Sequence, residues 1–527
     1  VADLFPNRTA AICDGKTISW RHFEHRASQI ASLLTAHGLG KDSKVALYLH
    51  NSNEYLEASF GAFKIEACPI NVNYRYKAEE LVYLLDNSDA EVVFFQSCYA
   101  MRIWEVKDQL PKVKAYIQID DGTEALLSGA LDYERSIRSL DKLPRQERDT
   151  QGIYMLYTGG TTGMPKGVMY EVGAFAGRFI DMTAAERELD HPNSFEEYRN
   201  FLSKIESPSV SLPACPLMHG TGMWLGGFLP LLSGGCVVMT SALGINPDLL
   251  LSMVETHRVT DLVIVGDVFA KPILESLDFA EKRNDPFDLG SLQKITSSGV
   301  MWSEDVKQGL LKHQDLVLTD IMGSTEGGMG SSVTTRGGFS AATAKFDLGD
   351  GVIAIADDGT EVLPGSGQIG RLATSVLVPL GYFKDPEKSK STFLEINGVR
   401  YSVPGDYARV EQDGTISLLG RGSVCINTAG EKVFPEEVEE VVKKHDSVVD
   451  CLVVGIPDDQ YGQQVIAVIS LEEDVMHEES LLKDFTKNHL TGYKVPKGFV
   501  CVVQVRRGPN GQGDYKWAKE TAIKYYC

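Results

Sequence analysis

The sequence predicts an α/β protein with a large N-terminal domain of packed parallel sheets and helices, followed by a small, mobile α+β C-terminal domain. Three observations predict this class. Short apolar runs alternate with amphipathic helical segments, which is typical of parallel sheets. The chain has 527 residues, more than one ordinary hydrophobic core accommodates. Past residue 400 the pattern changes to short strands that are joined by tight turns.

Four short apolar runs rich in Val, Ile or Phe are predicted to be strands. They span residues 44–50, 90–96, 235–240 and 261–267. Residues 18–40 carry apolar side chains at helical spacing and end at Gly38 and Gly40, so a helix is expected there.

Residues 171–209 are more polar and mostly helical in pattern, which indicates an insertion between two core elements. This insertion either shapes a pocket or covers the surface, and the sequence leaves both roles open.

Residues 405–421 indicate two strands joined by a turn at Gln412-Asp413-Gly414. A helix that begins at Pro435 and two strands, residues 451–458 and 463–471, are expected to follow. We therefore divide the chain into an N-terminal domain, residues 1–420, and a C-terminal domain, residues 421–527, with a hinge near residues 421–423.

Composition and charge exclude several classes of protein. Hydrophobic residues make up 43% and charged residues 23% of the chain, which is ordinary for a globular protein. The net charge of −21 repels nucleic acid and anionic membranes. No apolar run is long enough for a membrane span, and no signal peptide is visible. The nine cysteines have no zinc-ligand spacing, so reduced thiols in a cytoplasmic protein are expected.

Residues 157–168 read YTGGTTGMPKGV, a segment dense in glycine and threonine. Glycine lets backbone N–H groups approach a phosphate, and threonine hydroxyls and lysine add donors. The spacing is not that of a Walker A loop. We predict that Thr158, Thr161, Thr162 and Lys166 bind phosphate.

This loop resembles the phosphate loop of the ANL superfamily, which comprises acyl-CoA synthetases, adenylation domains and luciferases. Further motifs resemble the family in the same order, namely MGSTEGG (322–328), GDYARVEQDGTISLLGR (405–421) and GRGSVCINTAGEKVFPEEVE (420–439). The resemblance covers essentially the whole chain. Within the family the chain looks most like actinobacterial ligases for steroid or terpenoid acids, including acids of diterpenoid antibiotic pathways.

The resemblance implies a reaction in two steps. A carboxylate attacks the α-phosphate of ATP to give an acyl-adenylate and pyrophosphate, and the thiol of coenzyme A then displaces AMP. The C-terminal domain is expected to rotate between the two steps.

The resemblance also implies roles for individual residues in nucleotide binding. Thr325 is expected at the α-phosphate, Glu326 at Mg²⁺, Asp406 at the ribose hydroxyls, and Arg421 at a phosphate or ribose oxygen. Ser298, Gly299 and Val300 resemble the loop that flanks adenine, whereas Asp320, Met322, Gly323 and Ser324 form the adenine-side segment before Thr325. Other roles remain open: Asp320 as a helix cap, Glu326 as a helix-start carboxylate, and Arg421 as a surface ion pair.

A second group of residues is expected along the route of the thiol. His219 lies in PLMHGTGMWLGG, where family members often place an aromatic residue or histidine between the acyl pocket and that route; simple packing of His219 is the alternative. The resemblance places Gly430 and Glu431 at the passage for coenzyme A, and Ser423 at the hinge. Lys432 either contacts a phosphate of coenzyme A or stays solvated.

One position departs from the family pattern in a way that affects catalysis. The family motif usually reads Pro-x-Gly-Lys, and its lysine bridges the carboxylate and the α-phosphate during adenylation. Residues 509–515 read PNGQGDY, so Gln512 stands where the lysine is expected. Because Gln512 has no charge, adenylation should be lost or weak, at a cost of about 10²–10³ in rate. Thioester formation does not need that lysine.

Three hypotheses follow. The first is an enzyme that forms the thioester from a preformed acyl-adenylate and coenzyme A, with a separate adenylating enzyme as its partner. The second is a complete ligase that uses ATP and Mg²⁺, and the third is a non-catalytic protein that binds adenylates. Gln512 favours the first hypothesis over the second. A homodimer is compatible with the sequence.

Overall fold

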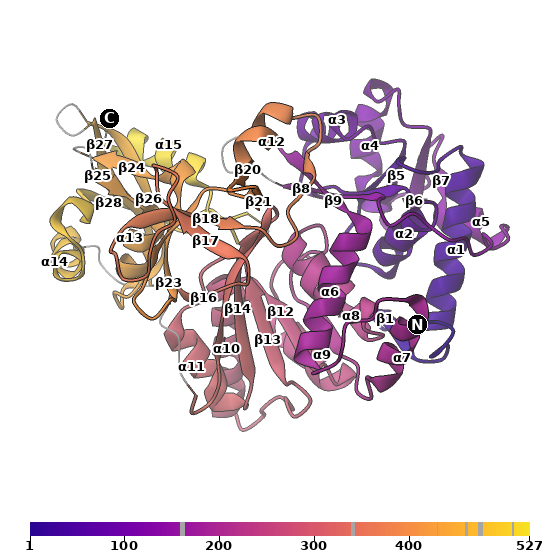
Figure 1. Cartoon of the computed structure of the whole chain (residues 1–527), viewed down its shortest axis with the longest axis horizontal. Coiled ribbons are helices and arrows are strands. Elements are labelled where there is room, and N and C mark those ends of the chain that lie inside the picture. The colour runs from indigo at the N-terminus through magenta and orange to yellow at the C-terminus, as the bar shows by residue number, and fades with distance from the viewer. Residues whose placement is uncertain are drawn as a thin grey trace.

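The computed structural model describes residues 1–158, 164–338, 343–428, 431–458, 462–472, 478–508 and 511–526, with only the backbone of Ser423 and Lys432. Figure 1 shows a large N-terminal part, in indigo to orange, and a smaller C-terminal part, in orange to yellow, at the other end of the molecule. The α/β class predicted from the sequence is confirmed, as is the order of a large domain before a small one.

The first sheet is parallel throughout, with strand order β4-β3-β5-β6-β7. Its strands are β3 (Lys44–Tyr48), β4 (Cys68–Asn71), β5 (Val92–Gln96), β6 (Ala115–Ile119) and β7 (Leu131–Asp132). The helical elements around them are α1 (Trp20–Ala36), α2 (Asn53–Phe63), α3 (Ala78–Asn87), η1 (Ser97–Tyr99), α4 (Ala100–Val106), η2 (Lys107–Gln109) and α5 (Tyr133–Arg138). The predicted helix 18–40 begins after the N-cap Ser19, whose hydroxyl accepts from the His22 N–H.

The second sheet is parallel over its first half. In spatial order these strands are β1 (Thr9–Cys13), β11 (Cys236–Met239), β10 (Val210–Pro213), β12 (Asp261–Ile264), β13 (Lys294–Ser298) and β14 (Val317–Ser324), with β2 (Lys16–Ser19) antiparallel at the edge. The helical elements in this region are η3 (Thr221–Phe228), α8 (Leu229–Leu232), α9 (Pro247–His257), α10 (Gly266–Lys282) and α11 (Glu304–His313). The apolar runs 235–240 and 261–267 thus form strands, although α10 already begins at Gly266.

From β14 onward the same sheet continues with antiparallel pairs. These strands are β15 (Gly327–Thr334), β16 (Lys345–Leu348), β17 (Val352–Ile355), β18 (Ile369–Thr374), β20 (Phe393–Ile396), β21 (Val399–Ser402), β22 (Asp406–Val410) and β23 (Ile416–Arg421). A small sheet of β8 (Ile153–Thr158), β9 (Lys166–Glu171) and β19 (Gly381–Tyr382), with α12 (Pro386–Thr392) beside it, lies between the two large sheets.

The large sheet ends with Arg421, and the elements that follow form separate sheets. They are η4 (Gly422–Val424), β24 (Ile426–Thr428), β25 (Glu431–Val433), α13 (Pro435–Val442), β26 (Val448–Asp458), β27 (Gly462–Leu471), α14 (Glu479–His489), η5 (Gly492–Lys494), β28 (Gly498–Cys501) and α15 (Tyr515–Tyr526). The strands pair as β24-β25 and β26-β27-β28. The boundary at residue 421 stays a prediction, but it coincides with this change of sheet.

The insertion 171–209 forms two helices, α6 (Val172–Glu186) and α7 (Phe195–Lys204). Phe175 of α6 joins a buried aromatic cluster, with its ring centroid 4.6 Å from that of Tyr154 and 5.3 Å from that of Trp224. Helix α7 packs on N-terminal residues, among them Leu4 and Phe5. In the described residues, α6 therefore forms part of the core, and neither helix lines the interdomain cavity described below.

No disulfide joins the cysteines of the described ranges. Within the same ranges, no helix combines the length and apolar character that a membrane crossing requires.

We predict that Phe175→Ala lowers the free energy of unfolding by about 3–5 kcal/mol, because it removes a buried aromatic side chain and leaves a cavity. The matched control is Phe195→Ala in the neighbouring helix, where the ring is 72% exposed and little change is expected. Chemical denaturation monitored by circular dichroism compares the two variants. Equal effects would show that α6 does not stabilise the core.

Candidate active site

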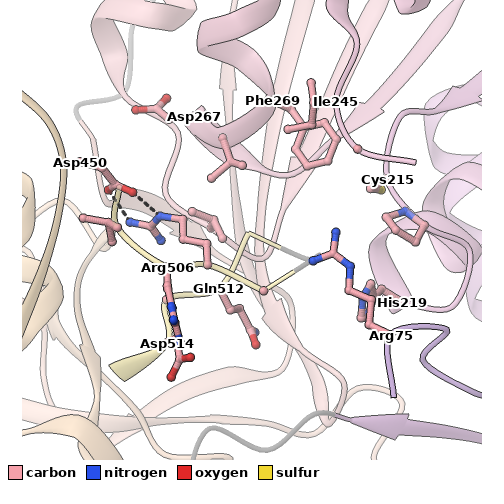
Figure 2. Close-up of a pocket in the computed structure, with 18 of the residues that line it drawn as sticks. Arg75, Cys215, His219, Ile245, Asp267, Phe269, Asp450, Arg506, Gln512 and Asp514 are labelled. Carbon is pink, nitrogen blue, oxygen red and sulfur yellow. Dashed lines mark hydrogen bonds and ion pairs between the residues drawn. The ribbon is translucent and has the colours of Figure 1, made fainter. Parts of the chain in front are cut away.

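A cavity of about 1750 Å³ separates the N-terminal part from the C-terminal elements. Its N-terminal wall includes Arg75, His219 and Val300, and its C-terminal wall includes Lys443 and Gln512. Figure 2 shows residues of both walls around the same space. The cavity therefore brings together segments that lie more than 400 positions apart in the chain.

The loop that carries Gln512 closes onto the N-terminal part. An added Cβ at Gly511, whose φ is +73°, would lie 3.2 Å from Val300 and 3.3 Å from Val265. The Gly508 N–H donates to the Gln512 carbonyl at 2.7 Å, which shapes the loop as a tight hairpin. Arg507, which directly precedes this turn, donates two hydrogen bonds to the Asp450 carboxylate, of 2.6 and 2.7 Å. The backbone thus delivers position 512 to the cavity (Figure 2).

Asp406 and Arg421 form a cross-strand pair of β22 and β23. The Arg421 Nε donates to Asp406 Oδ1 at 3.2 Å. The other oxygen, Asp406 Oδ2, is buried and has no hydrogen-bond partner in the described residues. A buried acceptor without a donor is costly, so a ribose hydroxyl fits this place. The nearby carboxylates, Asp406 foremost, raise the pKa of Arg421.

Thr325 and Glu326 occupy the turn between β14 and β15, so Glu326 is not a helix-start carboxylate. The Tyr382 hydroxyl donates to Glu326 Oε1 at 2.8 Å, and the Tyr170 hydroxyl donates to the Thr325 carbonyl at 2.6 Å. Mg²⁺ commonly binds through one or two carboxylates together with phosphate oxygens, so the Glu326 carboxylate suits that ion. Both tyrosines were absent from the sequence prediction because their contacts join distant segments.

The structure describes the beginning and the end of the predicted phosphate loop, up to Thr158 and from residue 164 onward. Thr158 closes β8 and pairs in register with Lys166, which opens β9. The Lys166 ammonium lies 2.5 Å from Asp385 Oδ2, a partner that the sequence did not indicate. Thr161 and Thr162 lie outside the described residues.

The two segments expected near adenine, residues 298–300 and 322–324, lie in different surroundings. Ser298 ends β13, and Gly299 follows with φ of +96° before Val300 reaches the cavity. Met322 is buried in the core of the antiparallel half of the sheet, in the strand that continues to Gly323 and Ser324.

The helix-cap reading of Asp320 is wrong, because this residue lies within strand β14. Its carboxylate is buried and lies 3.2 Å from the equally buried ammonium of Lys307. Burial raises the pKa of Asp320 to about 6, and Lys307 acts against that rise. A buried ammonium requires a counterion, so this carboxylate already has a partner, and its expected contact with adenine stays a prediction.

His219 precedes η3 on the wall opposite Gln512. Its Nε2 atom is buried without a hydrogen-bond partner in the described residues. Burial, followed by the positive charge of Arg75, lowers the pKa of His219 to about 4. The imidazole is therefore neutral near pH 7 and presents its ring to the cavity. Arg75, which follows β4, was not predicted from the sequence, because its segment carries no motif of its own.

The predicted contacts for coenzyme A are described only in part. Gly430 lies outside the described residues. Glu431 opens β25 and is exposed, and the Lys432 backbone belongs to the same strand. The Ser423 backbone lies in η4, directly after the large sheet.

We predict that Asp406→Asn weakens the binding of AMP by about 5- to 100-fold, because an amide N–H₂ replaces the free acceptor and about 1–3 kcal/mol is lost. Isothermal titration calorimetry measures the change. Asp413→Asn is the control, since that exposed carboxylate lies at the turn of the same hairpin and pairs with Lys345. Equal losses in the two variants would contradict the assignment of Asp406 to the ribose.

Several known proteins resemble this chain. The 3-oxocholest-4-en-26-oate–CoA ligase of Rhodococcus rhodochrous is 38% identical, over 98% of this chain and 94% of that protein. A medium/long-chain-fatty-acid–CoA/3-oxocholest-4-en-26-oate–CoA ligase of Mycolicibacterium smegmatis is 37% identical over the same shares.

Solved structures share the fold at lower sequence identity. The anthranilate CoA ligase AuaEII in complex with anthranoyl-AMP has a TM-score of 0.83 and 21% identity, over 99% of this chain and 96% of that one. ATP-bound MatB from Rhodopseudomonas palustris has a TM-score of 0.82 and 22% identity, over 100% and 99% of the two chains.

Family models agree with these similarities. Residues 437–511 match the AMP-binding enzyme C-terminal domain, and residues 1–376 match the AMP-binding enzyme model. The chain belongs to the AMP-binding enzyme family.

Proposed function

We propose that the protein is an acyl-CoA ligase that forms the thioester of coenzyme A with a bulky, apolar carboxylic acid through an acyl-adenylate. The observation that carries the proposal is the interdomain cavity, where the loop of Gln512 faces His219. The relatives named as ligases for a steroid acid or for medium- and long-chain fatty acids support an acid of the steroid or fatty-acid class, and a terpenoid acid is the further candidate that the sequence resemblance suggested.

The residues around the nucleotide account for recognition of the adenylate. The free Oδ2 of Asp406 accepts a ribose hydroxyl, and Arg421 places a positive charge beside the phosphate. Glu326, oriented by Tyr382, holds Mg²⁺ where ATP is used. That ion neutralises phosphate charge.

Thioester formation requires the thiol to reach the acyl carbonyl next to His219. The Nε2 atom of His219 is buried and has no hydrogen-bond partner in the described residues. Because the imidazole is neutral, it accepts a hydrogen bond there without adding charge. The thiol gives up its proton to water, its sulfur bonds to the carbonyl carbon, the bond from that carbon to the phosphate oxygen breaks, and AMP leaves with the electron pair of that bond.

Gln512 favours the thioester half of this reaction over the adenylating half. The loop is closed onto the cavity, so the neutral amide stands where a cation would offset charge on the α-phosphate. In the strongest form of the proposal, this chain does not adenylate, and a separate enzyme of the same pathway supplies the acyl-adenylate. A complete ligase with weak adenylation is the alternative.

Two assays on one preparation distinguish a chain that does not adenylate from a complete ligase. We expect acyl-CoA to form from synthetic acyl-adenylate and coenzyme A at least about 10²-fold faster than from free acid, ATP and coenzyme A. Comparable rates would establish a complete ligase, and the absence of product in both assays, with steroid, terpenoid and long-chain acyl groups, would overturn the proposed function.

We predict that Gln512→Lys increases ATP–pyrophosphate exchange with a cognate acid, because a charged donor returns to the carboxylate and the α-phosphate. The rate from acyl-adenylate should change little. Gln504→Lys is the matched control: Gln504 also lines the cavity from the C-terminal side, so it tests whether any added positive charge suffices. An exchange rate that does not rise, or that rises equally in the control, would show that position 512 is not the cause.

A further inference from the structure

Glu436 lies in the first turn of α13, against the last strand of the large sheet. The Arg421 N–H donates to Glu436 Oε1 at 3.4 Å. Gly420 precedes Arg421 with φ of +125°, and an added Cβ there would overlap the Glu436 carboxyl group. Glycine at position 420 therefore allows this carboxyl group to pack directly on the end of β23, next to the predicted hinge.

Few groups near the second oxygen of this carboxyl group could stabilise a negative charge on it. Glu436 Oε2 is buried and has no hydrogen-bond partner in the described residues. Its cationic neighbour, Arg421, is shared with Asp406 and Glu326. Burial, followed by the negative charges of Glu439 and Asp406, raises the pKa of Glu436 to about 8. Ionised Glu436 is thus disfavoured in this arrangement.

The contact lies at the predicted boundary between the two domains, where Glu436 packs on Gly420, the last residue of the N-terminal domain. Gly420 and Arg421 end the large sheet, whereas α13 packs on β26 in the C-terminal part. A rotation of the C-terminal part about residues 421–423 is expected to separate Glu436 from β23 and to expose its carboxyl group to water.

We propose that Glu436 is a positioning residue whose protonation holds the present domain orientation and whose ionisation favours rotation of the C-terminal domain. The proposal rests on the proposed function for the assumption that the domain rotates between two half-reactions.

The direction of the pH effect follows from linkage. In the present orientation Glu436 keeps its proton up to about pH 8, whereas a solvated glutamic acid loses it near pH 4.3. Between these values the present orientation binds more protons than the rotated one. Raising the pH in this window should therefore shift the equilibrium toward rotation, by up to about tenfold per pH unit.

Other titratable groups face Glu436 or the domain interface. Glu439 on α13 and Tyr515 on α15 interact with it electrostatically, as does Asp406 on β22. Across the cavity, burial raises the pKa of Asp267, which accepts hydrogen bonds from Ser303 and feels the charge of Lys443. A Glu436→Gln variant leaves all these groups in place and removes the titration of Glu436, while Glu439, whose pKa burial also raises, continues to titrate.

The test compares the wild type, Glu436→Gln and the control Glu437→Gln by small-angle X-ray scattering without substrates, from about pH 6 to about pH 9. Glu437 is the next residue, and its carboxylate pairs with Lys494 within the C-terminal part at 2.6 and 2.7 Å. We expect the scattering of the wild type and of Glu437→Gln to shift with pH, while Glu436→Gln stays in the present orientation throughout.

Thioester formation from synthetic acyl-adenylate supplies a second readout. Above about pH 8 the Glu436→Gln variant should be slower than the wild type by up to about tenfold per pH unit of the lost window, and its rate should lose the wild-type pH dependence. Wild-type scattering that does not change with pH, or a glutamine variant that follows the wild type, would overturn the proposal. If the wild type forms no thioester, the proposed function fails, and the scattering arm still decides the role of Glu436.

Discussion

The ion pair between Asp406 and Arg421 is the interaction on which the rest of the site depends. It lies in the last hairpin of the large sheet, where the two residues face each other in register. Glu326 and Glu436 also lie close enough to Arg421 to raise its pKa. The Arg421 side chain is partly buried, and its loss would leave the more deeply buried Asp406 carboxylate without its cation.

The Arg421 side chain therefore interacts with carboxyl groups in three parts of the site. Asp406 is the proposed ribose contact, Glu326 is proposed to hold Mg²⁺ on the phosphate side, and Glu436 lies in α13 of the C-terminal part. A change in charge at any of these places is felt by Arg421, which directly precedes η4 and the predicted hinge. Occupancy of the nucleotide position and orientation of the C-terminal domain are therefore expected to be linked energetically.

Local patterns were sufficient to predict much of the fold. The apolar run 44–50 forms β3, the helix expected over 18–40 is α1, which ends near Gly38, and the turn Gln412-Asp413-Gly414 joins β22 to β23. These features depend on periodicity and on turn chemistry, which a short window of sequence contains.

The contacts that organise the site were harder to foresee. Tyr382 reaches Glu326 across 56 positions, and Lys166 reaches Asp385 across 219. The pair of Lys307 and Asp320 gave no signal because neither residue alone marks a buried ion pair. The two roles open for the insertion 171–209 were distinguishable only from packing, since a polar helical pattern does not reveal that Phe175 is buried.

The segment that carries residue 512 is held by contacts of its backbone and of the neighbouring Arg507. Its turn is formed by backbone atoms of Gly508 and Gln512 and is anchored by Arg507 on Asp450. None of these contacts uses a charge at position 512, so Gln512→Lys is expected to change the charge at the cavity and to keep them. Under the proposed function, a change at this one position would be enough to divide the two-step reaction between two enzymes, and the reverse change would reunite the two steps in one chain.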